Sequence, residues 1–197
     1  MRHGGASQWP AVLLCIILCL HAAPPLRAAT LSFNVLDENG QSTAARFALK
    51  LNSIPWYPDR VGKNGWRYIS HHEGKRQIFV ATYATGKGQV DVPLPAGTER
   101  VEISIAKGFE YRPIKLTLNE FDTVQTFRLE RWVNLEKEGW VSADAHLHFD
   151  RFSKLYDPMF FTMMRGDGLG SIHFMYLIGG KVPGEWAVQY GYGKEGE

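Results

Sequence analysis

The segment Asp144-x-His146-x-His148 is the part of this sequence whose residue types and spacing are best suited to chemistry. Side chains of a β-strand alternate between its two faces, so residues two apart share a face, and at roughly 3.3 Å of rise per residue they can converge on one cation. Neutral imidazoles bind Zn, Mn or Fe, and a nearby carboxylate can bind the ion or orient a histidine. The spacing favours a divalent-metal site. Two structural histidines at a strand end are the alternative.

The other histidines beyond the first 28 residues give weaker signals. His71 and His72 are adjacent in a charged stretch and lack same-face spacing, so we expect them in a solvated loop. His173 stands inside an apolar run, where we expect a hydrogen-bonded core histidine. A position facing the metal centre is the alternative for His173.

The elements around the motif are predicted to place it on a buried strand. Polar and apolar residues alternate over residues 140–149, which predicts an extended strand buried on both faces. Asp157 as a cap and Pro158 at the first helical position predict a helix that ends at Gly166. The apolar run 172–178 predicts a second buried strand. Strand, helix and strand form a βαβ unit, so an α/β domain begins here.

Residues 31–132 precede this unit and carry short runs of alternating apolar and polar residues. Each run has period two, which gives each predicted strand one buried face, and Asn39-Gly40 and Ala96-Gly97 supply turns between them. About seven such strands in about 100 residues are typical of an antiparallel β-sandwich that folds on its own. Residues 53–74, which contain several prolines and glycines, are predicted to form a long irregular loop. The alternating runs are 31–35, 47–51, 90–94, 101–105, 114–118 and 127–129.

The first 28 residues are typical of a secretory signal peptide. Arg2 and His3 precede an apolar run that Pro24-Pro25 interrupts, and both cysteines lie within that run. The run is too short to span roughly 30 Å of hydrocarbon, so we expect export without a transmembrane anchor after cleavage.

Composition and charge narrow the class of protein. With 45% hydrophobic and 21% charged residues the chain can build an ordinary core, which excludes disordered, collagen-like and coiled-coil proteins. The net charge of +2 is accounted for by Arg2 and Arg27 in the leader, which has no acidic residue, so the rest of the chain is neutral. A neutral chain has no global attraction to nucleic acid or to anionic membrane surfaces.

The run Trp140-x-Ser142-x-Asp144-x-His146-x-His148 resembles the start of the metallohydrolase domain of carbaryl-hydrolase-like proteins in the polymerase-and-histidinol-phosphatase (PHP) superfamily. Ala143 stands where that family usually has glycine. The resemblance also includes residues 45–49, 108–113, 129–134 and 189–193, and so covers nearly the whole chain after the leader. The metal motif is its specific part, whereas the strand patterns are shared with carboxypeptidase-regulatory-like and transthyretin-like domains.

The resemblance implies a fold and a site. The fold is mainly β: an antiparallel Ig-like or transthyretin-like sandwich over residues 29–133, followed over residues 134–197 by the first strands of a PHP-type α/β barrel. The family holds two or three divalent metals that activate water. His146 and His148 would be metal ligands on the first barrel strand, and Asp144 a ligand or the residue that orients one.

The length departs from that family. The 63 residues from Leu135 onward are too few for a barrel of about 200 to 250 residues. We therefore expect an incomplete barrel that lacks the later ligands of the family, in a fragment or a truncated gene product that is inactive alone. The complete protein would be an exported metal-dependent hydrolase. It would cleave an ester, amide or carbamate bond of a small-molecule or cell-envelope substrate, in the periplasm or outside the cell.

A secreted, non-enzymatic β-sandwich binding module with a vestigial barrel segment is the alternative function. Trp56, Trp66 and Tyr68 would then be candidates for a sugar-stacking platform. Packing in the core or at a domain interface is the more common role of such aromatic residues.

The leader gives the first testable prediction. The small residues around Ala28 after the proline break predict that the mature N-terminus lies within a few residues of Ala29. N-terminal sequencing or the intact mass of exported protein measures this directly. Exported protein that still begins with Met1 would contradict the prediction.

Overall fold

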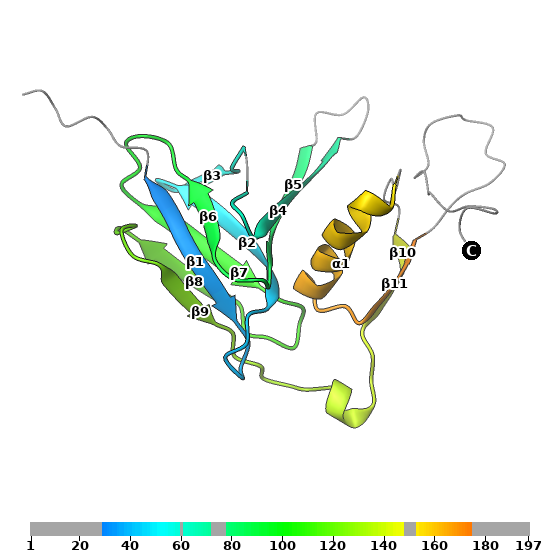
Figure 1. Cartoon of the computed structure of the whole chain (residues 1–197). Coiled ribbons are helices and arrows are strands. Elements are labelled where there is room, and N and C mark those ends of the chain that lie inside the picture. The colour runs from blue at the N-terminus through cyan, green and yellow to red at the C-terminus, as the bar shows by residue number, and fades with distance from the viewer. Residues whose placement is uncertain (1–28, 60, 72–77, 148–152, 175–197) are drawn as a thin grey trace, which may run out of the picture.

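The structure is a computed structural model and describes residues 29–59, 61–71, 78–147 and 153–174. Two β-sheets are followed along the chain by a short strand–helix–strand unit (Figure 1). The predicted signal peptide, residues 1–28, lies outside the described residues. In the part of the chain that is described, no helix is long and apolar enough to cross a membrane.

Within the described residues, nine strands form the two sheets. The smaller sheet has the order β6-β1-β9, in which β1 is antiparallel to β6 and parallel to β9. The larger sheet has the order β4-β5-β2-β7-β8 with β3 added beside β2, and all its pairs are antiparallel. The strands are β1 (Thr30–Leu36), β2 (Ala44–Leu51), β3 (Ile54–Trp56), β4 (Gly65–His71), β5 (Ile78–Thr85), β6 (Val90–Pro93), β7 (Val101–Ala106), β8 (Ile114–Leu118) and β9 (Gln125–Arg128).

The main core lies between these sheets and follows from the alternation in the sequence. Phe33 of β1 meets Phe47 of β2 edge-on, with ring centroids 5.1 Å apart, and Phe127 of β9 at 5.8 Å. Alternate residues of β1 and β7 are buried, whereas their neighbours are only half-buried or exposed. The prediction of a mainly β chain with antiparallel sheets in a sandwich is therefore confirmed, except that β1 and β9 pair in parallel.

The prediction of a long irregular loop over residues 53–74 is wrong. This stretch contains β3 and β4, and β4 pairs with the unpredicted strand β5 from Gly65 opposite Ala84 to His71 opposite Ile78. Pro55 lies within β3 and Gly65 begins β4, so these residues do not mark a continuous loop. Gly62 shows why glycine is needed there, because a Cβ atom at this position would overlap the backbone of Asp91.

The predicted βαβ unit is present. Strands β10 (Ala143–Leu147) and β11 (Ser171–Phe174) are parallel, with Ala143 opposite Ser171, and helix α1 (Asp157–Gly166) connects them. The short 3-10 helices η1 (Glu136–Glu138) and η2 (Lys154–Tyr156) precede β10 and α1. Asp157 was predicted as the cap, but it is the first helical residue and Tyr156 occupies the cap position without a side-chain hydrogen bond. The carboxylate of Asp157 then lies in the first turn, where the helix dipole favours a negative charge.

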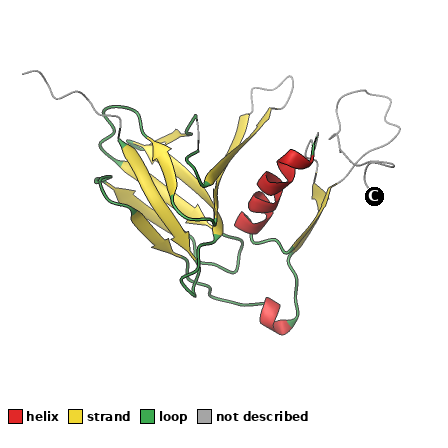
Figure 2. Ribbon diagram, in the orientation of Figure 1, coloured by secondary structure: helices red, strands yellow, loops and turns green. Residues whose placement is uncertain are grey.

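Helix α1 packs against the outer face of the larger sheet. Phe160 and Met163 of α1 form a second core cluster with Ala81 and Tyr83 of β5. A Cβ atom on Gly166 would lie 2.7 Å from Cδ1 of Tyr83, so glycine lets the end of the helix approach this ring. Figure 2 shows α1 between the sandwich and the β10–β11 pair.

The expected burial of the segment around β10 is wrong. Trp140 and Val141 are 66% and 68% exposed, and Ala143 and Ala145 are also exposed. The reason is that the buried residues of α1 face Ala81 and Tyr83 of the sandwich. Alternation alone cannot tell which surface a neighbouring helix covers.

The docking of α1 gives a prediction with a matched control. Phe160 is 3% exposed and its neighbour Phe161 is 42% exposed. Phe160→Ala should lower the free energy of unfolding by about 3 kcal/mol and speed amide exchange in α1, because it leaves a cavity against Tyr83. Phe161→Ala should cost less than about 1 kcal/mol. Thermal unfolding and hydrogen exchange measure both effects, and equal losses for the two variants would refute this packing.

Candidate metal centre

The predicted metal motif lies on β10 and at its carboxyl end. Asp144 is half-buried within the strand, and the backbone of His146 belongs to the same strand, which ends at Leu147. Because β10 and β11 are parallel, their carboxyl ends lie at the same edge of the sheet. His148 follows Leu147 directly. His148 and the side chain of His146 lie outside what the structure describes.

The pairing of β10 with β11 is irregular at the motif. Asp144 lies opposite Ile172 and Leu147 lies opposite Phe174, so β10 has one residue more than β11 over this interval. The interval contains Ala145 and His146. An extra residue of this kind is a β-bulge, which bends a strand and changes where its side chains point, and bulges are common beside functional sites. Period-two spacing in the sequence could not predict this feature.

The remaining histidines do not join the motif in the described residues. His173 of β11 is exposed, so the prediction of a core histidine is wrong. Its neighbour Ile172 is the residue paired with Asp144, and alternation places His173 on the opposite face. His71 ends β4 and its side chain is not described, while His72 lies outside the described residues. Among the described side chains, no three His, Cys, Asp or Glu residues are grouped for a metal ion.

The three aromatic residues considered for a sugar platform are divided between two cores. Trp56 packs against the core between the sheets, and Tyr68 packs against the cluster that contains Tyr83 and Phe160. Trp66 is 38% exposed. Packing in the core and at the interface with α1 therefore accounts for Trp56 and Tyr68.

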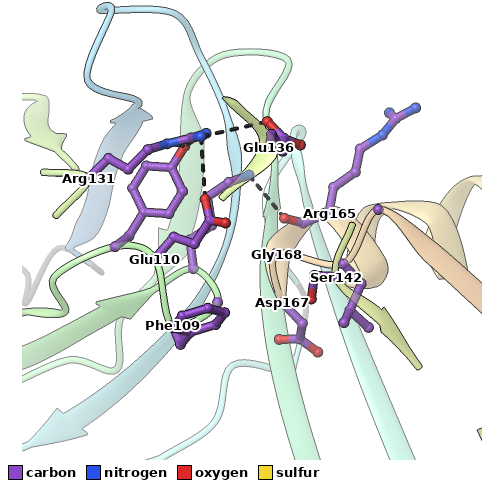
Figure 3. Close-up of a pocket in the computed structure, with 13 residues that line it drawn as sticks. Phe109, Glu110, Arg131, Glu136, Ser142, Arg165, Asp167 and Gly168 are labelled. Atoms are coloured by element: carbon purple, nitrogen blue, oxygen red, sulfur yellow. Dashed lines mark hydrogen bonds and ion pairs between the residues drawn. The ribbon is translucent and has the colours of Figure 1, made fainter. Parts of the chain in front are cut away.

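A cleft of about 230 Å³ lies between the sandwich and the C-terminal unit (Figure 3). One wall is the turn after β7, where Gly108 packs against the backbone of Asp167 and Gly168. The charged residues that line the cleft are Lys107, Glu110, Arg131, Glu136, Arg165 and Asp167.

Arg131 is held in the cleft by a network of partners. Its guanidinium group forms ion pairs with Glu38 at 2.9 Å, Glu110 at 3.3 Å and Glu136 at 3.6 Å. It also donates to the hydroxyl of Tyr111 and lies 4.8 Å from the centre of that ring. Burial opposes the positive charge, but Tyr111 and the carboxylates together raise the pKa of Arg131 above its ordinary value. Arg131 is therefore a structural cation.

Lys107 is the second half-buried cation of the cleft. Its Nζ atom donates to Oγ1 of Thr43 at 2.8 Å, to the carbonyl of Ala44 at 3.1 Å and to the carbonyl of Arg165 at 3.0 Å. Burial, followed by the nearby charge of Arg131, lowers the pKa of Lys107. These three contacts match the three donors of an ammonium group. Lys107 and Arg131 each bind groups of the sandwich and groups of the C-terminal unit. The cleft is therefore a joint between these two parts of the chain.

A second set of polar residues connects the two parts of the chain at the same joint. Arg46 donates to the hydroxyl of Tyr83 at 3.0 Å and forms an ion pair with Asp167 at 2.8 Å, and the Tyr83 hydroxyl lies 3.1 Å from the same carboxylate. Burial, with the negative charge of Asp167, raises the pKa of Tyr83 to about 12. Sequence inspection did not single out these residues. In the sequence, Lys107 and Asp167 are each followed by a glycine. In the structure both glycines have a positive φ angle.

No protein-family model matches this sequence, and no curated protein matches it. The geometry of the chain itself therefore supplies the case for a function.

Tyr83 gives a prediction about pH. Between pH 10 and 12 the unfolded chain loses a phenol proton that the folded chain keeps, so the free energy of unfolding should fall as pH rises through this window. One pKa unit corresponds to about 1.4 kcal/mol, and with solvent screening at the joint we expect a loss of about 1–2 kcal/mol. Tyr83→Phe should remove this loss. Tyr57→Phe, at a position that is 50% exposed, is the control. Urea unfolding at several pH values tests it, and identical profiles for all three proteins would contradict it.

Proposed function

We propose that this chain is part of an exported metal-dependent hydrolase, in which Asp144, His146 and His148 contribute to a divalent-metal site. The observation that carries this proposal is the parallel β10–β11 pair joined by α1, with the motif on β10 and at its carboxyl end. In parallel α/β domains, catalytic residues gather at the carboxyl ends of the strands. In an antiparallel hairpin the carboxyl ends of the two strands lie at opposite edges, so the same motif there would not support a catalytic site in this way.

The donor set fits a hydrolytic metal. Two imidazoles and one carboxylate suit Zn, Mn or Fe, and such an ion supplies a bound water acidic enough to attack a carbonyl group near neutral pH. His146 and His148 would bind the ion, and Asp144 would bind it or hold an imidazole in the required orientation. A site of four to six ligands needs further donors. These would come from outside the described residues.

The sequence resemblance to carbaryl-hydrolase-like PHP proteins supports the same function. It includes both the metal motif and the sandwich that precedes it. The predicted signal peptide indicates that the protein is exported. The substrate would then be a small molecule or a cell-envelope compound in the periplasm or outside the cell. The bond would be an ester, amide or carbamate.

Metal binding by histidine variants tests this proposal. His146→Ala and His148→Ala should each weaken the binding of Zn²⁺ or Co²⁺ at least about tenfold, since even residues that only orient a ligand contribute that much. His173→Ala, on an exposed position of the neighbouring strand, should bind like the unaltered chain. Titration against a competing chelator measures the affinities, and circular dichroism checks that the sandwich stays folded. Equal affinity in all four proteins would show that the motif is not the site.

Hydrolysis requires a separate measurement. Because three donors leave the ion short of ligands, the 197-residue chain should bind metal weakly and hydrolyse neither esters nor carbamates. In a longer form that carries the remaining ligands, His146→Ala or His148→Ala should abolish metal-dependent hydrolysis, and Asp144→Asn should reduce it. Tight stoichiometric metal with turnover in the 197-residue chain would overturn the proposed shortage of ligands.

A further inference from the structure

The joint between the sandwich and α1 lies close, along the chain, to the metal motif. Lys107 donates to the carbonyl of Arg165 in the last turn of α1, and Arg46 pairs with Asp167 one residue beyond the helix. Gly108 and Gly168 pack backbone against backbone, and a Cβ atom on Gly168 would lie 2.8 Å from Cα of Gly108. The end of α1 is thus fixed to the sandwich by an ammonium group, an ion pair and a close backbone contact.

A short path leads from this joint to β10. Leu169 donates its amide to the carbonyl of Met164, which closes the end of α1. The amides of Gly170 and Ser171 then donate to the carbonyl of Ser142, at 2.8 and 3.1 Å. Ser142 immediately precedes β10, and Asp144 is two residues further on. Since a residue spans at most about 3.6 Å, β10 cannot move far from the joint without breaking these bonds.

The chain that enters β10 is anchored at the same turn of the sandwich. The amide of Leu135 donates to Oε1 of Glu110 at 3.3 Å, and Glu136 pairs with Arg131. Figure 3 shows Glu110, Arg131 and Glu136 together across the cleft from Arg165 and Gly168. The chain before β10 is therefore bonded to the sandwich at Leu135 and Glu136, and the starts of β10 and β11 are bonded to each other through the carbonyl of Ser142.

Lys107 is the residue of this turn that joins the most segments. Its ammonium group bridges Thr43 and Ala44, at the start of β2, to the carbonyl end of α1. A cation at the carbonyl end of a helix is favoured by the helix dipole. A buried charge is costly unless it is fully hydrogen-bonded, so its bonds resist separation of the two parts. The charged groups that act on it are Arg131, Asp37, Glu38 and Glu136.

We infer that Lys107 is a positioning residue for the metal motif: it fixes the end of α1 on the sandwich and thereby sets the place of β10. This inference rests on the proposed metal site for its functional consequence. It assigns the sandwich a task in the chemistry, namely to hold the first metal strand at a defined position while touching neither metal nor substrate.

The test compares Lys107→Met with Lys115→Met, the latter at an exposed position of β8. Lys107→Met keeps most of the length of the side chain but removes its three hydrogen bonds. It should speed amide exchange at the end of α1 and in β10 about tenfold or more, without changing exchange in β1 and β7. The affinity for Co²⁺ should fall about tenfold, as for other residues that orient ligands, and the visible spectrum of the bound ion should change. Lys107→Arg should restore part of the protection from amide exchange and part of the Co²⁺ affinity.

A second variant covers the case in which Lys107→Met unfolds. Asp167→Asn weakens the pair with Arg46 at the same joint. It should cause smaller changes of the same kind in amide exchange and in Co²⁺ affinity. If either folded variant exchanges and binds Co²⁺ like Lys115→Met, the positioning role is wrong. If the unaltered chain binds no Co²⁺, the proposed function fails. In that case amide exchange alone decides whether Lys107 sets the place of β10.

Discussion

The burial of Tyr83 on the outer face of the larger sheet is the constraint on which the arrangement of the chain depends. Its ring is 1% exposed, although it lies on the side of β5 that faces away from the core between the sheets. A sandwich alone would leave this face to solvent. Phe160 and Met163 of α1 cover it, and the absence of a side chain at Gly166 allows the helix to come close. The sandwich and the βαβ unit are thereby parts of one packed structure.

The polar groups at the border of this contact limit how the two parts can meet. Arg46 and Asp167 pair directly across it and both contact the hydroxyl of Tyr83, and Lys107 donates to groups on both sides. Apolar contact is tolerant of small shifts, whereas the hydrogen bonds of these partly buried ions require defined distances and angles. The apolar cluster therefore supplies most of the attraction, and the ions fix the orientation.

The same border connects the fold to the proposed chemistry. A metal site depends on the position of its ligands, and an isolated pair of strands is a poor scaffold for it. Here the amides of Gly170 and Ser171 bind the carbonyl of Ser142, just before β10. The chain on either side is bonded to the turn 107–111 at Leu135 and at Arg165 in the last turn of α1. The extra residue of β10 lies between Asp144 and Leu147, so the strand departs from regular pairing within the motif.

The sequence alone determined the elements whose signal is local. Alternation predicted β1, β2 and β7, because each side of such a strand meets one environment, and Pro158 and Gly166 bounded α1 to within a residue. The spacing of Asp144, His146 and His148 indicated a metal motif before any fold was known. Only the tertiary structure decided what lies far apart in the chain but close in space. The pairing of Lys107 with Arg165, the cover of Tyr83 by α1 and the exposure of His173 depend on which surfaces meet, and residue types within one segment do not encode that choice.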